Sequence, residues 1–230
     1  MNKILARGGV EFVAVLLGIT LSLYLDEQSD LNSKKQNERN LLSDLQVSLK
    51  QDLSYAEDIQ KGLTNCVDSH NVLLSIRCNE TKKYSRNEVA ELLYNSSRGV
   101  KSFFPRYGVY RSLVSNSDMR FIQNDKLKDL MINLYDFRFK RYENMDIVME
   151  NIYQYDYNEF LVNNFNINAQ DTLKYVEKNF ILNHDFLCSD VFKKKIRYIS
   201  GITYGSKVAV DEIIKSMISL DNLISEELKK

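Results

Sequence analysis

The chain contains almost none of the residues that interrupt helices. Its 230 residues include a single proline, Pro105, and only eight glycines. A fold of many β-strands needs both residue types, because they supply the backbone angles of tight turns. Long segments without them, in which apolar positions recur every three or four residues, are typical of α-helices. The sequence therefore predicts an all-α protein.

An apolar segment near the N-terminus, residues 8–25, predicts a transmembrane helix. Glu11 is its only ionisable side chain. At about 1.5 Å per residue the segment reaches roughly 27 Å, close to the ~30 Å thickness of the hydrocarbon layer. A cleaved signal peptide is the alternative, because Lys3 and Arg7 give the start a basic character. No small-residue cleavage pattern follows the segment, however, so we expect a retained anchor.

The charges that flank this segment predict its orientation. Lys3 and Arg7 precede it, whereas Asp26, Glu27 and Asp30 follow it. Positive flanks remain on the cytoplasmic side of a membrane, so the body of the chain is expected outside. The expected domains are a short cytoplasmic N-terminus at 1–7, the transmembrane helix at 8–25 and a helical extracytoplasmic domain at 26–230.

One face of the predicted span carries small side chains. Ala14, Gly18 and Ser22 recur every four residues, and Glu11 lies within a turn of the same face. Small residues at this spacing let two membrane helices approach closely, which predicts a homo-oligomer in the lipid bilayer. Glu11 has two interpretations. It either reaches the headgroups or pairs with Arg7, or it faces a neighbouring helix, where it could line a pore.

Beyond the membrane the sequence predicts one long helix that continues the anchor and packs with further long helices as a bundle. A capping-box pattern from Ser85 to Glu88 opens a short helix, and Asn124 or Asp125 begins a helix to about Phe160. A final helix is expected over 189–228, with Gly201 and Gly205 marking a kink or a close crossing. The apolar positions of the long helix that continues the anchor are Leu42, Leu45, Leu49, Leu53, Ala56, Ile59, Leu63 and Val67.

The three cysteines leave one thiol unpaired. Cys66 and Cys78 would stand about 18 Å apart on an unbroken helix, too far for a disulfide, so a bond between them requires the helix to end and turn. Two states are left open: a Cys66–Cys78 disulfide or buried free thiols. A zinc site is not expected, because three cysteines and two histidines occur without paired Cys-x-x-Cys spacing.

Other chemistry has little support in the sequence. No nucleophile elbow, zinc-protease motif, phosphate-binding glycine loop or dinucleotide fingerprint is present. Lysine plus arginine and aspartate plus glutamate are both 31, so no basic surplus favours nucleic acid as a partner. We therefore expect a protein that is not an enzyme, with no cofactor.

Four segments together resemble an uncharacterised bacterial family of small single-pass membrane proteins, a domain of unknown function. They are EFVAVLLGITLSLYLDEQSD, ERNLLSDLQVSLKQDL, FFPRYGVYRSLVSNSDMRFIQNDKLKDLMINLYDF and LDNLISEEL. The resemblance implies an anchored, helical, inner-membrane protein with a periplasmic domain, and no activity. The chain departs from the pattern at 26–30, where family members carry Asn and Trp. The matching positions are Glu11, Tyr110 with Leu113, and Ile122 with Asn124 and Leu127.

Two functions from different classes fit these features. The first is a membrane-anchored structural or interaction protein, oligomeric through its anchor, that is part of a membrane complex or pore with protein partners. The second is an extracytoplasmic helical sensor or ligand-binding module that works with a partner subunit, since helical bundles often bind small molecules between their helices.

Overall fold

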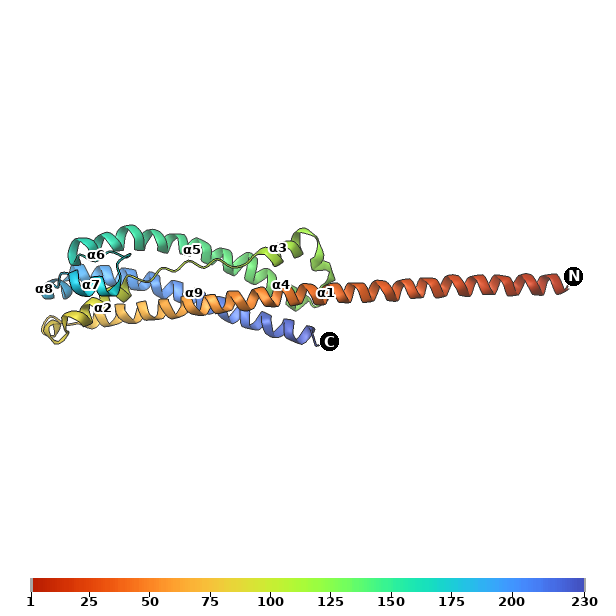
Figure 1. Ribbon diagram of the computed structural model, residues 1–230, viewed down its shortest axis with the longest axis horizontal. Coiled ribbons are helices and arrows are strands. Elements are labelled where there is room, and N and C mark those ends of the chain that lie inside the picture. The colour runs from red at the N-terminus through yellow and green to blue at the C-terminus, as the bar shows by residue number, and fades with distance from the viewer. Residues whose placement is uncertain (1, 230) are drawn as a thin grey trace.

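The computed structural model describes residues 2–229, with side chains from residue 15 onward, and every regular element in this range is helical. Three long helical rods form the body (Figure 1). The first rod is α1, Asn2–Ser75, and the last is α9, Asp190–Glu227. The middle rod joins α4 (Asp125–Ile132), η3 (Asn133–Phe139), α5 (Lys140–Asn151), η4 (Ile152–Tyr157) and α6 (Asn158–Phe165) without a break.

Shorter elements close the two ends of the bundle. At the end away from the N-terminus lie η1 (Thr81–Lys83), α2 (Arg86–Ser96), α7 (Leu173–Asn179) and α8 (His184–Leu187). At the other end lie α3 (Gly108–Ser115) and η2 (Asp118–Phe121). The all-α prediction is therefore confirmed for the described residues.

The rods differ in direction, as the contacts between them show. Gln46 of α1 bonds Ser225 of α9, and Gln60 bonds Asp211, so these two helices are antiparallel. The middle rod is also antiparallel to α9, because the ion pairs between them join later residues of the middle rod to earlier residues of α9. The pairs are Arg138 with Glu212 and Asp156 with Lys195.

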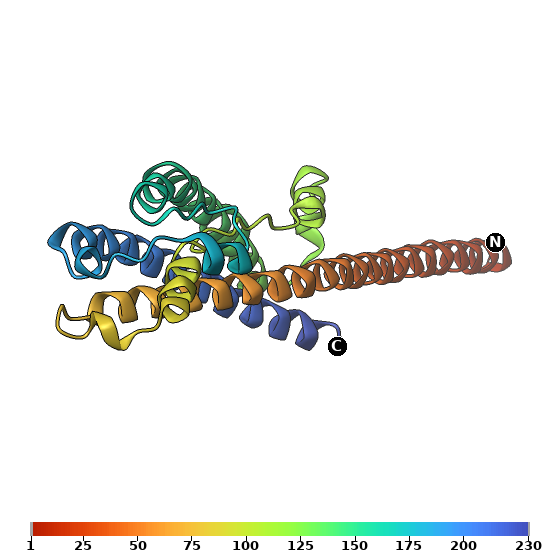
Figure 2. The same ribbon diagram turned by 60° about the vertical axis from the view of Figure 1, so that its left-hand side comes forward.

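An extended segment at 98–107 returns the chain along the whole bundle from α2 to α3, as Figure 2 shows beside α1. Asp52, fully buried on α1, holds this segment. Its carboxylate accepts hydrogen bonds from the backbone N–H of Arg106 at 2.8 Å and from its guanidinium at 2.7 Å. Burial raises the pKa of Asp52, while the bonds to Arg106 oppose that rise. Asp52 interrupts the apolar positions of α1, so a polar partner was to be expected.

Two π-helical turns, η3 and η4, keep the middle rod aligned with its neighbours. The buried positions of its second half advance in steps of four, and an α-helix with 3.6 residues per turn would rotate such positions away from the core. A π-turn absorbs the extra residues and returns the positions to one face. These positions are Met149, Tyr153, Tyr157, Leu161 and Phe165.

Several local predictions are confirmed and others are corrected. Ser85 and Glu88 form both bonds of a capping box, and Asn124 caps α4 by accepting a bond from Leu127 N–H. The middle rod runs to Phe165 rather than to about Phe160. Neither Gly201 nor Gly205 marks a close helix crossing, because a Cβ at either would meet nothing within 4 Å.

Candidate functional site

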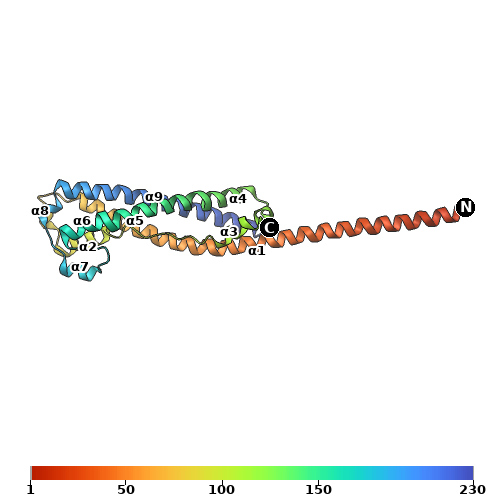
Figure 3. The ribbon, with the colours of Figure 1, turned by 90° about the horizontal axis from the view of Figure 1, so that it is seen from above.

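The N-terminal part of α1 stands clear of the bundle, as Figures 1 and 3 show. We call its exposed residues 15–37 the stem. Its apolar side chains are 50% exposed at Leu16 and 63% at Leu17, although a soluble fold normally covers such a cluster. Most of its exposed large side chains lie in the first turns, and Leu31 follows farther along; those of the first turns are Val15, Leu16, Leu17, Ile19, Leu21, Leu23, Tyr24 and Leu25.

The predicted span at 8–25 lies only partly within the described side chains. Gly18 and Ser22 are exposed on the stem, and a Cβ at Gly18 would meet nothing within 4 Å. Glu11 and Ala14 lie outside the residues whose side chains are described. Among the described residues, no helix has an apolar stretch long enough to cross a membrane.

A buried polar cluster surrounds Cys66. Its thiol lies 3.3 Å from the hydroxyl of Tyr153 and donates to the carbonyl of Ser96 at 3.2 Å. The Tyr153 hydroxyl also lies 2.6 Å from Oγ1 of Thr203. The backbone at Gly99 passes so close to Tyr153 that a Cβ at this position would overlap the Tyr153 ring, so only glycine fits there.

Cys66 and His70 have the residue types of a nucleophilic pair but not the required charge states. Burial raises the pKa of the Cys66 thiol to about 12, and burial lowers the pKa of His70 to about 4. Both groups are therefore neutral near pH 7, whereas a reactive cysteine needs a thiolate and access to its substrate. The cluster joins α1, α2, the middle rod and α9, and its role in this structure is packing.

Neither of the two states left open for the cysteines describes all three of them: the Cys66–Cys78 disulfide is not formed, and only Cys66 is a buried free thiol. Cys78 bonds to Cys188, with their Cα atoms 5.1 Å apart, and Cys66 is a buried free thiol. Because α1 continues unbroken to Ser75, Cys66 stays within the bundle while Cys78 follows the helix end. Cys188 directly follows α8, so the bond ties the end of α1 to the start of α9. No group of three or more His, Cys, Asp or Glu side chains within the described residues could hold a metal ion.

Glu11 lies outside the residues whose side chains are described, and the other five positions of the family pattern lie in or beside the core near the stem. Leu113, Ile122 and Leu127 are fully buried, and Tyr110 stacks on Tyr135 with ring centroids 4.4 Å apart. Asn124, besides capping α4, donates to Oε1 of Glu227 at 2.5 Å. These residues therefore fix the turn between α3 and α4 against the end of α9, and of the five only Tyr110 lines a pocket that is described below.

A pocket between α3 and the middle rod carries paired charges. The Tyr110 hydroxyl donates to Asp136 at 2.5 Å, and Lys140 contacts the other oxygen of that carboxylate at 3.0 Å. The Tyr107 hydroxyl donates to Glu143 at 2.7 Å. The bond from Tyr110, helped by Lys140, lowers the pKa of Asp136. Because each carboxylate already accepts a bond from a tyrosine, the pocket links α3 to the middle rod.

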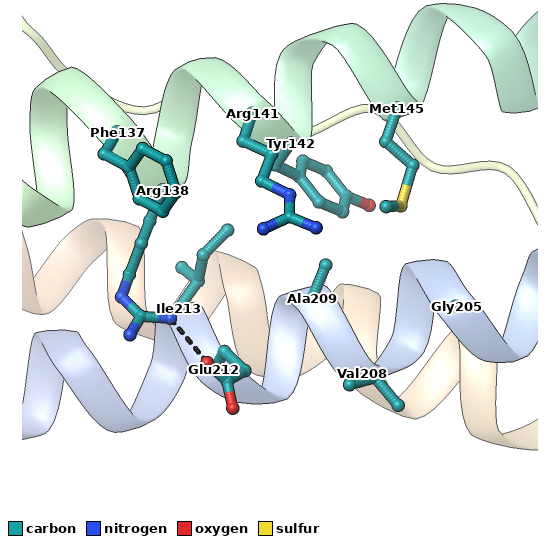
Figure 4. A pocket seen from close by; sticks show the side chains of 10 residues that line it. All are labelled: Phe137, Arg138, Arg141, Tyr142, Met145, Gly205, Val208, Ala209, Glu212 and Ile213. Atoms are coloured by element: carbon teal, nitrogen blue, oxygen red, sulfur yellow. Dashed lines mark hydrogen bonds and ion pairs between the residues drawn. The ribbon is translucent and has the colours of Figure 1, made fainter.

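A groove of about 190 Å³ lies between the middle rod and α9 (Figure 4). Met145 and Ala209 give it half-buried apolar surfaces beside the buried Tyr142, and Gly205 leaves one end open. Arg138 pairs with Glu212 at 2.6 Å on its rim. Arg141 extends between the two helices without a hydrogen bond or ion pair to the rest of the described chain. Sequence reasoning missed this groove, because its two walls are far apart in the chain.

No protein-family model matches the chain, and neither do any of the curated proteins or solved structures with which it was compared. The resemblance to a family of single-pass membrane proteins therefore stays a prediction. Function has to be argued from the stem, the disulfide and the groove.

Proposed function

We propose that this chain is a single-pass membrane protein whose N-terminal helix anchors a helical bundle outside the bilayer, where the bundle acts as a structural or interaction module. The observation that carries the proposal is the exposed apolar part of the stem. Leu17, Leu21 and Leu23 are 60–63% exposed, and no other part of the described chain packs on them. A lipid environment would bury them at a gain of about 25 cal/mol per Å².

The disulfide supports the proposed side of the membrane. Disulfides persist in oxidising compartments such as the bacterial periplasm and are rare in the cytosol. Cys78–Cys188 lies at the end of the bundle farthest from the stem, well away from any membrane that the stem enters. A bundle outside the cytoplasm, reached through a cytoplasmic N-terminus, agrees with the basic residues Lys3 and Arg7 before the apolar segment.

Membrane fractionation tests the anchor. The full chain should sediment with membranes and resist extraction by alkaline carbonate. Replacing both Leu17 and Leu21 by lysine should release it, because each lysine costs about 3 kcal/mol at the centre of a membrane helix. Neither side chain packs in the fold, so the released protein should keep the helical content of the bundle, as measured by circular dichroism.

The control places the same two charges elsewhere. Ile147 and Val148 are exposed on the bundle, at 58% and 53%, and lysine at both positions should leave the chain in the membrane fraction. A wild-type chain that stays in the soluble fraction would contradict the proposal.

A further inference from the structure

The groove between the middle rod and α9 has an unbalanced charge. Its rim carries two guanidinium groups, Arg138 and Arg141, and one carboxylate, Glu212. Since Arg138 is bonded to Glu212, Arg141 is the remaining charge. Surrounding cations also act on this carboxylate: the bond to Arg138 lowers the pKa of Glu212, and the nearby charges of Lys215 and Arg141 add to this. The electrostatics of the groove therefore favour an anion.

The surfaces beneath Arg141 are apolar. Figure 4 shows the Tyr142 ring and the Met145 thioether on the middle rod facing Ala209 and Ile213 of α9. The fold already buries Tyr142 and Ile213, so the apolar surface left for a carbon skeleton to cover is that of the half-buried Met145 and Ala209. A guanidinium presents parallel N–H donors that match the two oxygens of a carboxylate.

The position of the groove separates it from the membrane. Gln60 of α1 contacts Asp211, which lies in the stretch of α9 that lines the groove. Along α1 the distance from Leu25 to Gln60 is roughly 50 Å, well beyond the reach of headgroups at the end of the apolar segment. A ligand from solution fits this place better than a lipid of the anchoring membrane.

We propose that this groove binds a small organic carboxylate, whose charged group pairs with Arg141 and whose apolar body lies against Met145 and Ala209. The inference goes beyond the proposed anchoring function and does not depend on it.

Benzoate is the probe, because it combines one carboxylate with a compact apolar ring. The full chain carries six methionines, and Met145 is the one that lines the groove. With methyl-labelled methionine, adding benzoate should shift the Met145 resonance in a saturable way, with a Kd on the order of 1 mM. Met119, Met131 and Met217 lie outside the groove lining and serve as references. Acetate lacks the ring and benzamide lacks the charge, so both should leave the Met145 signal nearly unchanged.

Two substitutions test the two halves of the site. Arg141→Gln removes the charge from an exposed side chain that makes no bond in the fold, so affinity should fall about tenfold or more without loss of stability. Ala209→Leu should block the groove. A helical side chain leans toward the preceding turn, which here is the open space over Gly205.

Arg111→Gln is the matched control. Arg111 is also an exposed arginine beside an aromatic ring, 4.9 Å from the centre of Tyr107, but it lies in the other pocket. The Arg111 variant should bind benzoate like the wild type. The proposal fails if benzoate does not shift Met145 in the wild type, or if Arg141→Gln binds it equally well. Equal binding of benzamide would also overturn it, since it would remove the role of the charge.

Discussion

At the scale of single residues, several polar groups in the interior of this bundle have specific partners, whereas the buried Tyr135 hydroxyl has none among the described residues. Asp52 accepts two bonds from Arg106, and Cys66 lies between Ser96 and Tyr153. A buried polar group that loses its partner destabilises the fold, so these contacts favour one arrangement of the rods. The position of Asp52 among leucines was a sequence signal of a buried pair, but its partner lies 54 positions away and nothing local identified it.

His70 should make stability depend on pH. An unfolded histidine has a pKa near 6.5, whereas burial lowers the pKa of His70 to about 4 in the fold. Below pH 6.5 the unfolded chain therefore binds a proton at His70 that the native state does not bind. The contribution of His70 to the free energy of unfolding, which is present above pH 6.5, is lost as pH falls toward 4. The loss from this group is about 3 kcal/mol at most.

Chemical denaturation between pH 4 and 8 measures this effect, with His70→Gln as the comparison. The groups that face the ring are Cys66, 3.9 Å away, and Tyr157, and both stay neutral in this range. The free energy of unfolding of the variant should vary less with pH than that of the wild type. Parallel curves would show that His70 takes up its proton inside the fold.

At the scale of elements, a positively charged side chain from α9 caps the C-terminal end of α1. The Lys193 ammonium group, at the start of α9, donates to the carbonyl oxygens of Leu73, Leu74 and Ile76 at 2.6–2.9 Å. The last carbonyls of a helix have no partner within it, and a positive charge there also interacts favourably with the negative end of the helix dipole. One side chain thus caps the longest helix of the protein.

Replacing this cap should destabilise the bundle locally. Lys193→Met keeps the aliphatic part of the side chain and removes the ammonium, so we expect a loss of about 2 kcal/mol. Amide hydrogen exchange should become faster in the last turn of α1. Lys194→Met changes an exposed neighbour and should alter stability by no more than about 0.5 kcal/mol. Equal effects of the two variants would rule out the cap as the cause.

Helices and their starting residues could be predicted from the sequence because their causes are local. The capping box at Ser85 and Glu88 and the cap at Asn124 each depend on bonds between a side chain and a backbone N–H three residues away. The sequence also carries a signal of the π-turns, since Tyr153, Tyr157 and Leu161 follow one another in steps of four. The disulfide and the groove could not be predicted, because each joins surfaces that meet only after the rods have packed.

At the scale of the whole molecule, the stem predicts assembly. Gly18 and Ser22 present a small face on which another helix can pack closely. The mass of the detergent-extracted chain should exceed that of one copy, and Gly18→Leu should reduce it to a monomer. Leucine at Thr20, on the opposite side of the helix, should leave the mass unchanged. An oligomer that survives Gly18→Leu would place assembly in the bundle.

The continuity of α1 has a mechanical consequence. Between Gly18 and Gly62 the helix contains no glycine, and the single proline lies outside it. A rotation of the stem about its own axis is therefore transmitted to the bundle without a hinge, and inserting one residue in the stem would turn the bundle by about 100° relative to the residues that precede the insertion. The length and phase of the stem together set which face of the bundle, and so which way the groove, is presented to a neighbouring molecule.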